Sequence, residues 1–197
     1  MPKPRAAQRL VRAAAVIIYL LAFTTVPATA QYYDPYGRYQ GSRSFFGYGR
    51  PSGGPSTVDF PAHHKPGTIL ISTSQRRLYL MLGNGQALQY PIGVGRIGFT
   101  WNGVTRVSAK REWPSWTPPA EMRRRRPDLP RHMAGGMDNP LGARALYLGS
   151  TLYRIHGSNE PETIGQAVSS GCFRMSNEDV VDLYNRVPVG ATVIVQH

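Results

Sequence analysis

Apolar and polar residues alternate with a period of two along several segments of the chain, and this period is typical of β-strands. Ile69 and Ile71 share one face of the first such segment, and Leu78 and Leu80 share one face of the next. Gly-Asn-Gly at 83–85 stands between the second segment and a third, which predicts a hairpin turn. Further strands are predicted within 86–94, 103–113, 143–148, 151–156 and 188–197, with a short strand or turn at 169–173.

The period changes to that of a helix at 177–187. Val180, Tyr184 and Val187 follow the i, i+4, i+7 spacing of an amphipathic helix. Ser176, directly before them, is a preferred N-cap residue. Many strands with hairpin turns and one helix in the C-terminal half indicate a mainly β fold, either a sandwich or a barrel.

Residues 113–138 follow neither period. They contain five prolines, two tryptophans and four consecutive arginines, Arg123–Arg126. We interpret this segment as a long loop or lid with one helical turn at 119–125, since loops of this length in a compact domain are usually either functional or disordered. The arginine run is most simply a solvated surface, and contact with an acidic polymer is the alternative.

Residues 1–30 have the pattern of a secretory signal peptide. A basic, acid-free start is followed by an uncharged apolar run at 13–26 and by a small-x-small cleavage pattern that ends at Ala30. We expect cleavage there, because the apolar run is shorter than the roughly 20 residues of a membrane-spanning helix. The alternative is an uncleaved anchor. After cleavage we expect no membrane span, a disordered Gly/Tyr/Arg-rich linker at 31–65, and one domain at 66–197.

Charge and cysteine content narrow the class of function. The formal net charge is +12, and about +8 remains without the signal peptide. This balance favours anionic partners such as lipid head groups or an acidic cell-wall polymer. Nucleic acid is not expected, because an exported protein rarely meets it. The single cysteine, Cys172, has no partner for an intramolecular disulfide, and a lone cysteine with scattered histidines argues against a structural zinc site.

Cys172 has neighbours that suit nucleophilic catalysis. A thiol needs a base to remove its proton, and His156 ends a predicted strand sixteen positions earlier. Adjacent strands would bring the two side chains together. The small residues before the cysteine allow a sharp turn, in which the backbone amides of Ser170, Gly171 and Cys172 point at a developing oxyanion. The alternative is that both are ordinary core or sheet-edge residues.

The sequence around these two residues is similar to a known family. His-Gly-Ser at 156–158, followed by Ser-Ser-Gly-Cys-Phe-Arg-Met at 169–175, resembles the L,D-transpeptidase catalytic domain, also called the YkuD domain. The segments 90–95, 139–148 and 176–195 also stand where the family has similar sequence. The resemblance covers roughly 68–197 and implies the mainly β sandwich of this family, with a long lid loop.

The resemblance also implies a substrate and a mechanism. Peptidoglycan stem peptides would be the substrate, and Cys172 would attack the carbonyl of the third stem residue and release the terminal D-Ala. His156 would accept the thiol proton, and the backbone carbonyl of Gly157 would orient its ring. The amides of Ser170, Gly171 and Cys172 would stabilise the intermediate. No metal or cofactor is required, and carbapenems would acylate the thiol.

Less direct roles follow from the same resemblance. Arg174 would lie at the pocket edge and pair with a stem carboxylate, or else form an ion pair within the fold. The segment 113–138 would cover the cleft, with Trp116 or Met133 lining it. The expected location is the periplasm of a Gram-negative bacterium. The acyl acceptor stays open: a second stem, an outer-membrane protein, a D-amino acid or water.

Two departures from the family pattern stand out. Ser170 replaces a common histidine, and Trp101-Asn102-Gly103 replaces a common Thr-Pro-x-Gly. The first concerns a turn that acts through its backbone, and the second concerns the donor pocket. Three alternatives remain: a cell-wall cysteine peptidase or carboxypeptidase, a non-catalytic wall-binding module, and a binder of polyanions or membrane surfaces. Peptidases of the NlpC/P60 type place Cys before His, and a non-catalytic module would be expected to lack one of the two.

Overall fold

The computed structural model describes residues 54–61 and 64–197. The predicted signal peptide, 1–30, and the larger part of the predicted linker, 31–65, lie outside these residues. No helix within the described part of the chain is long and apolar enough to cross a membrane.

Eleven strands and two α-helices make up the described residues, together with a 3₁₀ turn at Pro161–Thr163. The strands are β1 (Ser56–Asp59), β2 (Ile69–Ser72), β3 (Arg77–Gly83), β4 (Gln86–Pro91), β5 (Val94–Gly95), β6 (Gly103–Glu112), β7 (Arg144–Leu148), β8 (Arg154–His156), β9 (Ala167–Ser169), β10 (Phe173–Arg174) and β11 (Thr192–Gln196). The helices are α1 (Ala120–Arg125) and α2 (Asn177–Arg186). Nine strands form one sheet in the order β1-β4-β3-β2-β11-β6-β7-β8-β10, and β5 pairs with β9.

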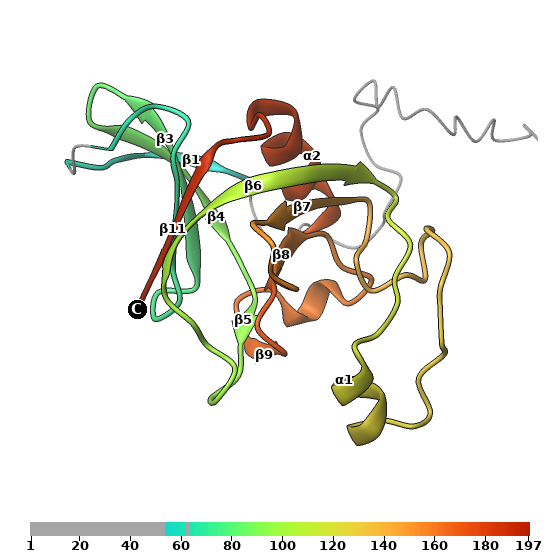
Figure 1. Ribbon diagram of the computed structural model, residues 1–197. Helices are drawn as coiled ribbons and strands as arrows, with labels where there is room; N and C mark the ends of the chain where they lie inside the picture. The colour runs from blue at the N-terminus through green and yellow to red at the C-terminus, as the bar shows by residue number, and fades with distance from the viewer. Residues whose placement is uncertain (1–53, 62–63) are drawn as a thin grey trace, which may run out of the picture. The chain divides into compact units, whose positions relative to one another are not determined.

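The long strand β6 joins the two halves of the main sheet. Its first part, Gly103–Arg106, pairs with β11, and its second part, Val107–Glu112, pairs with β7 (Figure 1). Both halves contribute to one apolar core, with Ile69, Ile71, Leu78, Leu80 and Tyr90 from the first half and Leu146, Leu148, Ile155 and Phe173 from the second. The predicted mainly β fold is confirmed, and the alternating residues of the predicted strands supply its core.

The predicted turn and helix are also confirmed. The β3–β4 hairpin turns at Asn84 and Gly85, with φ values of 53° and 73°, as a type I′ turn requires. The Ser176 side chain accepts a hydrogen bond of 3.1 Å from the backbone N–H of Asp179, which caps α2. Val180 and Leu183 of this helix are fully buried in the core. The helix therefore holds the chain that leaves β10.

One expectation about the linker is wrong. Ser56–Asp59, inside the predicted linker at 31–65, forms β1 and pairs antiparallel with β4. Val58 and Phe60 pack on the outer face of the first half-sheet, against Leu70, Tyr79, Met81 and Ala87. The edge strand has only four residues and is preceded by Gly-Gly-Pro, so its alternation is too short to be recognised in the sequence.

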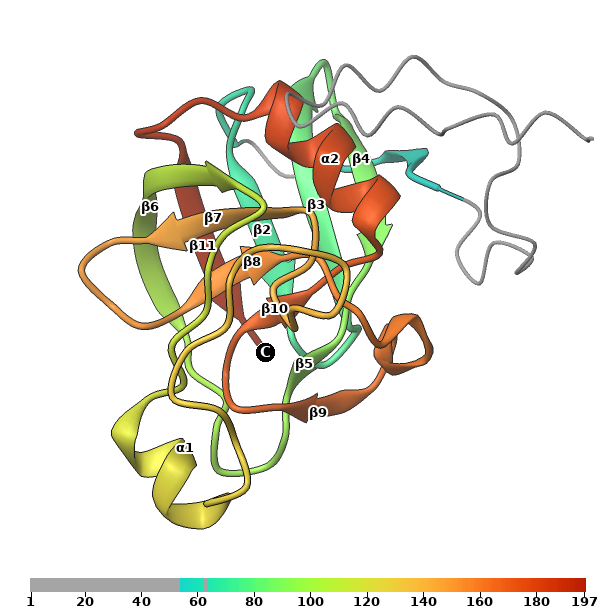
Figure 2. The same cartoon turned by 90° about the vertical axis from the view of Figure 1, so that its right-hand side faces the viewer.

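The segment between β6 and β7 leaves the sheet as a long excursion. The helix α1 forms within it, as the sequence predicts, and both views show α1 at the far end of the loop, away from the strands (Figures 1 and 2). Trp116 and Met133 pair with each other across the two arms of the loop, with both N–H···O=C hydrogen bonds at 2.8 Å. The bridge makes the excursion a hairpin-like arm rather than an open loop.

Candidate active site

The pairing of β8 with β10 brings His156 and Cys172 to the same side of the sheet. The two strands are parallel neighbours, with Phe173 opposite Ile155, and both of these side chains are fully buried in the core. His156 follows Ile155, and Cys172 precedes Phe173. Because successive side chains of a strand point to opposite faces, His156 and Cys172 both lie on the face away from the core.

Both edges of β10 are paired, which fixes the chain directly after Cys172. On one side β10 runs beside β8. On the other side Arg174 and Gly93 exchange two backbone hydrogen bonds, of 2.8 Å and 2.9 Å. Met175 then donates its N–H to the carbonyl of His156 at 2.8 Å. The chain at Cys172 is therefore held by the sheet and by α2, which follows it.

The imidazole of His156 is buried and oriented by its own neighbour. Its Nδ1 lies 2.6 Å from the backbone carbonyl oxygen of Gly157. A carbonyl can only accept, so Nδ1 carries the proton and Nε2 keeps its lone pair. Burial, helped by the charges of Arg174 and Arg154, lowers the pKa of His156 to about 3, although the hydrogen bond to Gly157 opposes this shift. The ring is thus neutral at physiological pH and available as a base.

The thiol of Cys172 is free and half-buried. Its Sγ lies 3.7 Å from the backbone carbonyl oxygen of Leu152. Burial raises the pKa of the thiol, and the positive charge of Arg154 opposes that rise. At rest the site therefore holds a neutral thiol and a neutral imidazole, so the proton must move from one to the other when the sulfur attacks.

The turn before Cys172 is braced by the hydroxyl of Ser169. Its Oγ donates to the carbonyl oxygen of Cys172 at 2.6 Å and accepts from the N–H of Gly171 at 3.1 Å. The Gly171 amide is therefore already bonded in this conformation and is not free to donate to an oxyanion. The N–H groups of Ser170 and Cys172 have no hydrogen-bond partner within residues 64–197. The candidate oxyanion donors are thus reduced to these two.

Aromatic residues close around Gly171. Its φ is +108°, and a Cβ at this position would lie 2.5 Å from Cε1 of Tyr153 and 3.0 Å from the carbonyl oxygen of Phe99. The indole N–H of Trp101 donates to the Gly171 carbonyl at 3.3 Å, and its ring stacks on Tyr153 with centroids 4.8 Å apart. Trp101, a departure from the family pattern, thus becomes part of the support of the turn.

Replacing Gly171 with alanine is expected to lower the free energy of unfolding by more than the cost of placing alanine in a left-handed backbone conformation. Gly190 has a similar φ of +92° with nothing within 4 Å of its Cβ position, so Gly190→Ala is the matched control. The control should lose about 1–2 kcal/mol from the left-handed conformation. Gly171→Ala should lose about 1–3 kcal/mol more, because Tyr153 and Phe99 must move. Urea unfolding of both variants measures the difference, and equal losses would contradict the steric argument.

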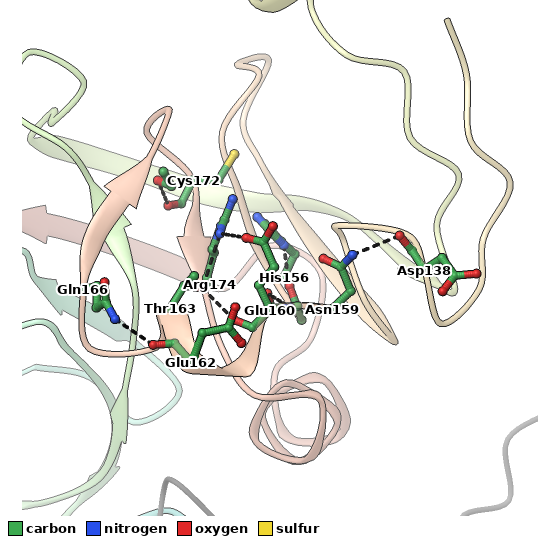
Figure 3. A network of polar contacts seen from close by, with 12 residues as sticks. Asp138, His156, Asn159, Glu160, Glu162, Thr163, Gln166, Cys172 and Arg174 are labelled. Atoms are coloured by element: carbon green, nitrogen blue, oxygen red, sulfur yellow. Dashed lines mark hydrogen bonds and ion pairs between the residues drawn. The ribbon is translucent and has the colours of Figure 1, made fainter. Parts of the chain in front are cut away.

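Arg174 forms the ion pair that the sequence left as the alternative to substrate binding. Its Nη1 lies 2.7 Å from Oε2 of Glu160 and 3.3 Å from Oγ1 of Thr163 (Figure 3). In the parallel ladder Arg174 stands opposite His156, so it is close to the site. Because its charge is engaged by Glu160, Arg174 does not offer a free guanidinium to a stem carboxylate in this conformation.

The backbones of Trp116 and Met133 pair with each other in the 113–138 arm. Both side chains are half-buried. Within residues 64–197, neither residue forms a hydrogen bond with Cys172 or His156. Their contact with substrate remains a prediction.

Several supporting residues were not recognised in the sequence. Asn177 accepts from the N–H of Ala143 at 2.9 Å and donates to the carbonyl of Ser158 at 3.1 Å, which ties the chain after Gly157 to the chain before β7. Its only sequence signal is its position at the start of α2. Ser169 belongs to the quoted motif, but nothing in the motif specifies its hydroxyl contacts.

Metal-ligand clusters are also not apparent. Within residues 54–61 and 64–197, no group of three or more His, Cys, Asp or Glu side chains could hold a metal ion.

Comparisons with known proteins identify the family of the chain. The family model for the L,D-transpeptidase catalytic domain (YkuD) matches residues 66–195. The probable L,D-transpeptidase YbiS of Escherichia coli (strain K12) is 38% identical over 154 residues, which cover 73% of this chain and 50% of YbiS. The putative L,D-transpeptidase YkuD of Bacillus subtilis (strain 168) is 36% identical over 145 residues, which cover 72% of this chain and 70% of YkuD.

Solved structures show the same fold at lower identity. An L,D-transpeptidase from Mycobacterium smegmatis superposes with a TM-score of 0.54 at 18% identity, covering 66% of this chain and 58% of that chain. One from Mycobacterium tuberculosis H37Rv gives 0.53 at 21% identity, covering 66% and 57%. The chain spans about half the length of the E. coli relatives it matches. From the family model and these relatives, the chain belongs to the L,D-transpeptidase catalytic domain (YkuD) family.

Proposed function

We propose that the chain is a peptidoglycan L,D-transpeptidase that uses Cys172 as nucleophile and His156 as base. Membership of the family supports this activity. The observation that carries the proposal is the parallel pairing of β8 and β10, which puts both side chains on one face, with Nδ1 of His156 held by the Gly157 carbonyl. That arrangement leaves Nε2 free for the thiol proton.

The first half-reaction forms a thioester and releases D-Ala. Nε2 of His156 takes the proton of Sγ while the sulfur attacks the carbonyl carbon of the third stem residue. The amides of Ser170 and Cys172 donate to the resulting oxyanion. When the C–N bond to D-Ala breaks, the imidazolium of His156 returns the proton to the leaving amine. The acyl group is then bound to Cys172, and the histidine is neutral again.

The second half-reaction passes the acyl group to an amine. The acceptor nitrogen attacks the thioester carbonyl, His156 accepts one of its protons, and the sulfur leaves and is reprotonated. An amine of a second stem would give a 3→3 cross-link, and an amine of an outer-membrane protein would anchor that protein to the wall. Water would give hydrolysis. These steps use groups of the chain and its substrates alone.

The surroundings of the site fit an anionic wall polymer outside the cytoplasm. The net charge of about +8 that remains without the signal peptide and the Arg123–Arg126 run in the 113–138 arm favour such a substrate. We infer export through the signal peptide at 1–30 and residence in the periplasm, with the domain at 66–197 carrying the activity. We also infer that carbapenems acylate Cys172, since they present a reactive carbonyl to the same nucleophile.

Release of D-Ala from a disaccharide tetrapeptide tests the proposal. The full chain, without its signal peptide, is expected to release D-Ala and to form a cross-linked dimer in matching amounts, both followed by mass spectrometry. D-Ala release with only a tripeptide product would indicate the carboxypeptidase alternative. Binding of peptidoglycan without any release would indicate the non-catalytic module. Salt-sensitive binding to anionic vesicles alone would indicate the polyanion binder.

A further inference from the structure

Arg154 lies in the same row of side chains as the nucleophile. In the β7–β8 ladder Arg154 stands opposite Tyr147. In the β8–β10 ladder Phe173 stands opposite Ile155, so Cys172, one residue earlier, comes level with Arg154. The row Tyr147–Arg154–Cys172 therefore crosses three strands on the face that carries the site.

The contacts of Arg154 converge on the thiol. Its Nη1 donates to the carbonyl oxygen of Leu152 at 3.0 Å, and the Cys172 sulfur lies 3.7 Å from that same oxygen. The guanidinium sits over the ring of Tyr147, 5.0 Å from its centroid, which fixes its position. Its Nε is buried and has no hydrogen-bond partner among the described residues. An oriented guanidinium with an unused donor therefore lies beside the sulfur.

The charge of Arg154 is not neutralised by a carboxylate. None of the salt bridges within residues 64–197 includes it. The second arginine near the thiol, Arg174, is paired with Glu160. Arg96, on the loop after β5, lies 4.3 Å over the ring of Phe99. In the β8–β10 ladder, Arg154 is thus the cation level with Cys172 that has no carboxylate partner among the described residues.

The imidazole of His156, on the strand next to the thiol, is neutral because burial lowers its pKa. The ring of Tyr153 stacks on Trp101. Negative charge that develops on the sulfur therefore meets two cations, of which one is already engaged by Glu160.

We propose that Arg154 is a positioning residue that stabilises the thiolate of Cys172, a role that rests on the nucleophilic function proposed above. When the Sγ proton passes to Nε2 of His156, the guanidinium stays protonated and faces the new negative charge. It offsets the penalty that burial places on the thiolate. Arg154 therefore acts through its charge on the equilibrium between thiol and thiolate. The transferred proton is on His156.

The test follows the reactivity of the single thiol with iodoacetamide as a function of pH. In this reaction the thiolate displaces iodide, an S–C bond forms, and the thiol proton goes to the buffer. For Arg154→Gln the midpoint of the rate profile should rise by about one pH unit, and the rate at pH 7 should fall about tenfold. Arg154→Lys, which keeps a positive charge, should recover most of the wild-type profile.

Arg106→Gln is the matched control. Arg106 also donates to a backbone carbonyl, that of Gly190 at 3.1 Å, but it lies on β6 beside β11. Its profile should coincide with that of the wild type. The same measurement on Arg154→Met, which keeps the aliphatic volume, replaces Arg154→Gln if circular dichroism shows that the Gln variant is unfolded.

Two results would overturn the inference. One is an unchanged midpoint in a folded Arg154→Gln or Arg154→Met variant. The other is an Arg154→Lys profile as displaced as that of Arg154→Gln, which would indicate that packing and not charge matters. Iodoacetamide does not require a peptidoglycan substrate, so the outcomes are separable from the proposed function. If the pH profile of the iodoacetamide reaction shifts in Arg154→Gln but the wild type releases no D-Ala, the transpeptidase proposal is wrong and the role of Arg154 still holds.

Discussion

Replacing Cys172 with alanine is expected to abolish D-Ala release, with a fall in rate on the order of 10⁴-fold or more. In the proposed mechanism the sulfur forms the covalent intermediate, and no other thiol is present in the 197 residues to substitute for it. The same variant should lose the carbapenem adduct, which intact-protein mass spectrometry detects as a single added mass in the wild type. Because the chain has one cysteine, the adduct reports on this position alone.

The folding control for this variant is thermal unfolding. Cys172 is half-buried and makes one weak contact through its sulfur, so Cys172→Ala should unfold within a few degrees of the wild type. Cys172→Ser keeps the size of the side chain and serves as a second variant. A carbapenem adduct that survives in both variants would place the nucleophile elsewhere, and the mechanism proposed above would then be wrong.

Replacing His156 with glutamine is expected to slow acylation of Cys172 by about 10²–10⁴-fold. Glutamine can still donate to the Gly157 carbonyl, but it has no basic nitrogen to take the thiol proton. His197→Gln is the matched control. His197 directly follows β11, contacts the hydroxyl of Thr73 and has no part in the site. Stopped-flow measurement of carbapenem acylation compares the two. Equal rates in wild type and His156→Gln would show that the thiol does not need this base.

The low pKa of His156 also predicts the pH dependence of the wild type. The imidazole should remain an unprotonated base well below pH 6.5, because burial lowers its pKa to about 3. The rate of acylation by a carbapenem should therefore show no inflection near pH 6.5 from protonation of this base when the pH is lowered to 5. An inflection near pH 6.5 that disappears in His156→Gln would contradict the burial argument.

The same shift affects stability through proton linkage. Between pH 6.5 and about 3 the unfolded chain binds a proton at His156 that the folded protein excludes. Stability should therefore fall with decreasing pH in this window, by up to about 1.4 kcal/mol per pH unit. In His156→Gln this contribution is absent, so its urea midpoint should decline less steeply from pH 6.5 to pH 4. Parallel slopes for the two proteins would count against a buried neutral imidazole.

The local elements could be predicted because their signals are local. The alternation around Ile69 and Leu78, the Gly-Asn-Gly turn at 83–85 and the cap at Ser176 each act within a few residues, and backbone sterics or a single hydrogen bond decide them. The motif that joins His156 to Cys172 is also contained in one continuous segment, so the candidate pair could be named. The short strand β1 was missed because its stability comes from an edge partner thirty residues away along the chain.

The sequence by itself therefore determined the strand pattern, the helix and the identity of the candidate nucleophile and base. Only the tertiary structure decided how they are used. The parallel pairing of β8 and β10 put Cys172 and His156 on one face. The Ser169 hydroxyl accepts a hydrogen bond from the Gly171 amide, and Glu160 forms an ion pair with Arg174. In each case several hydrogen-bonding or charged partners were possible. Which partner is used depends on the distances between segments of the chain, and those distances are set only when the chain folds.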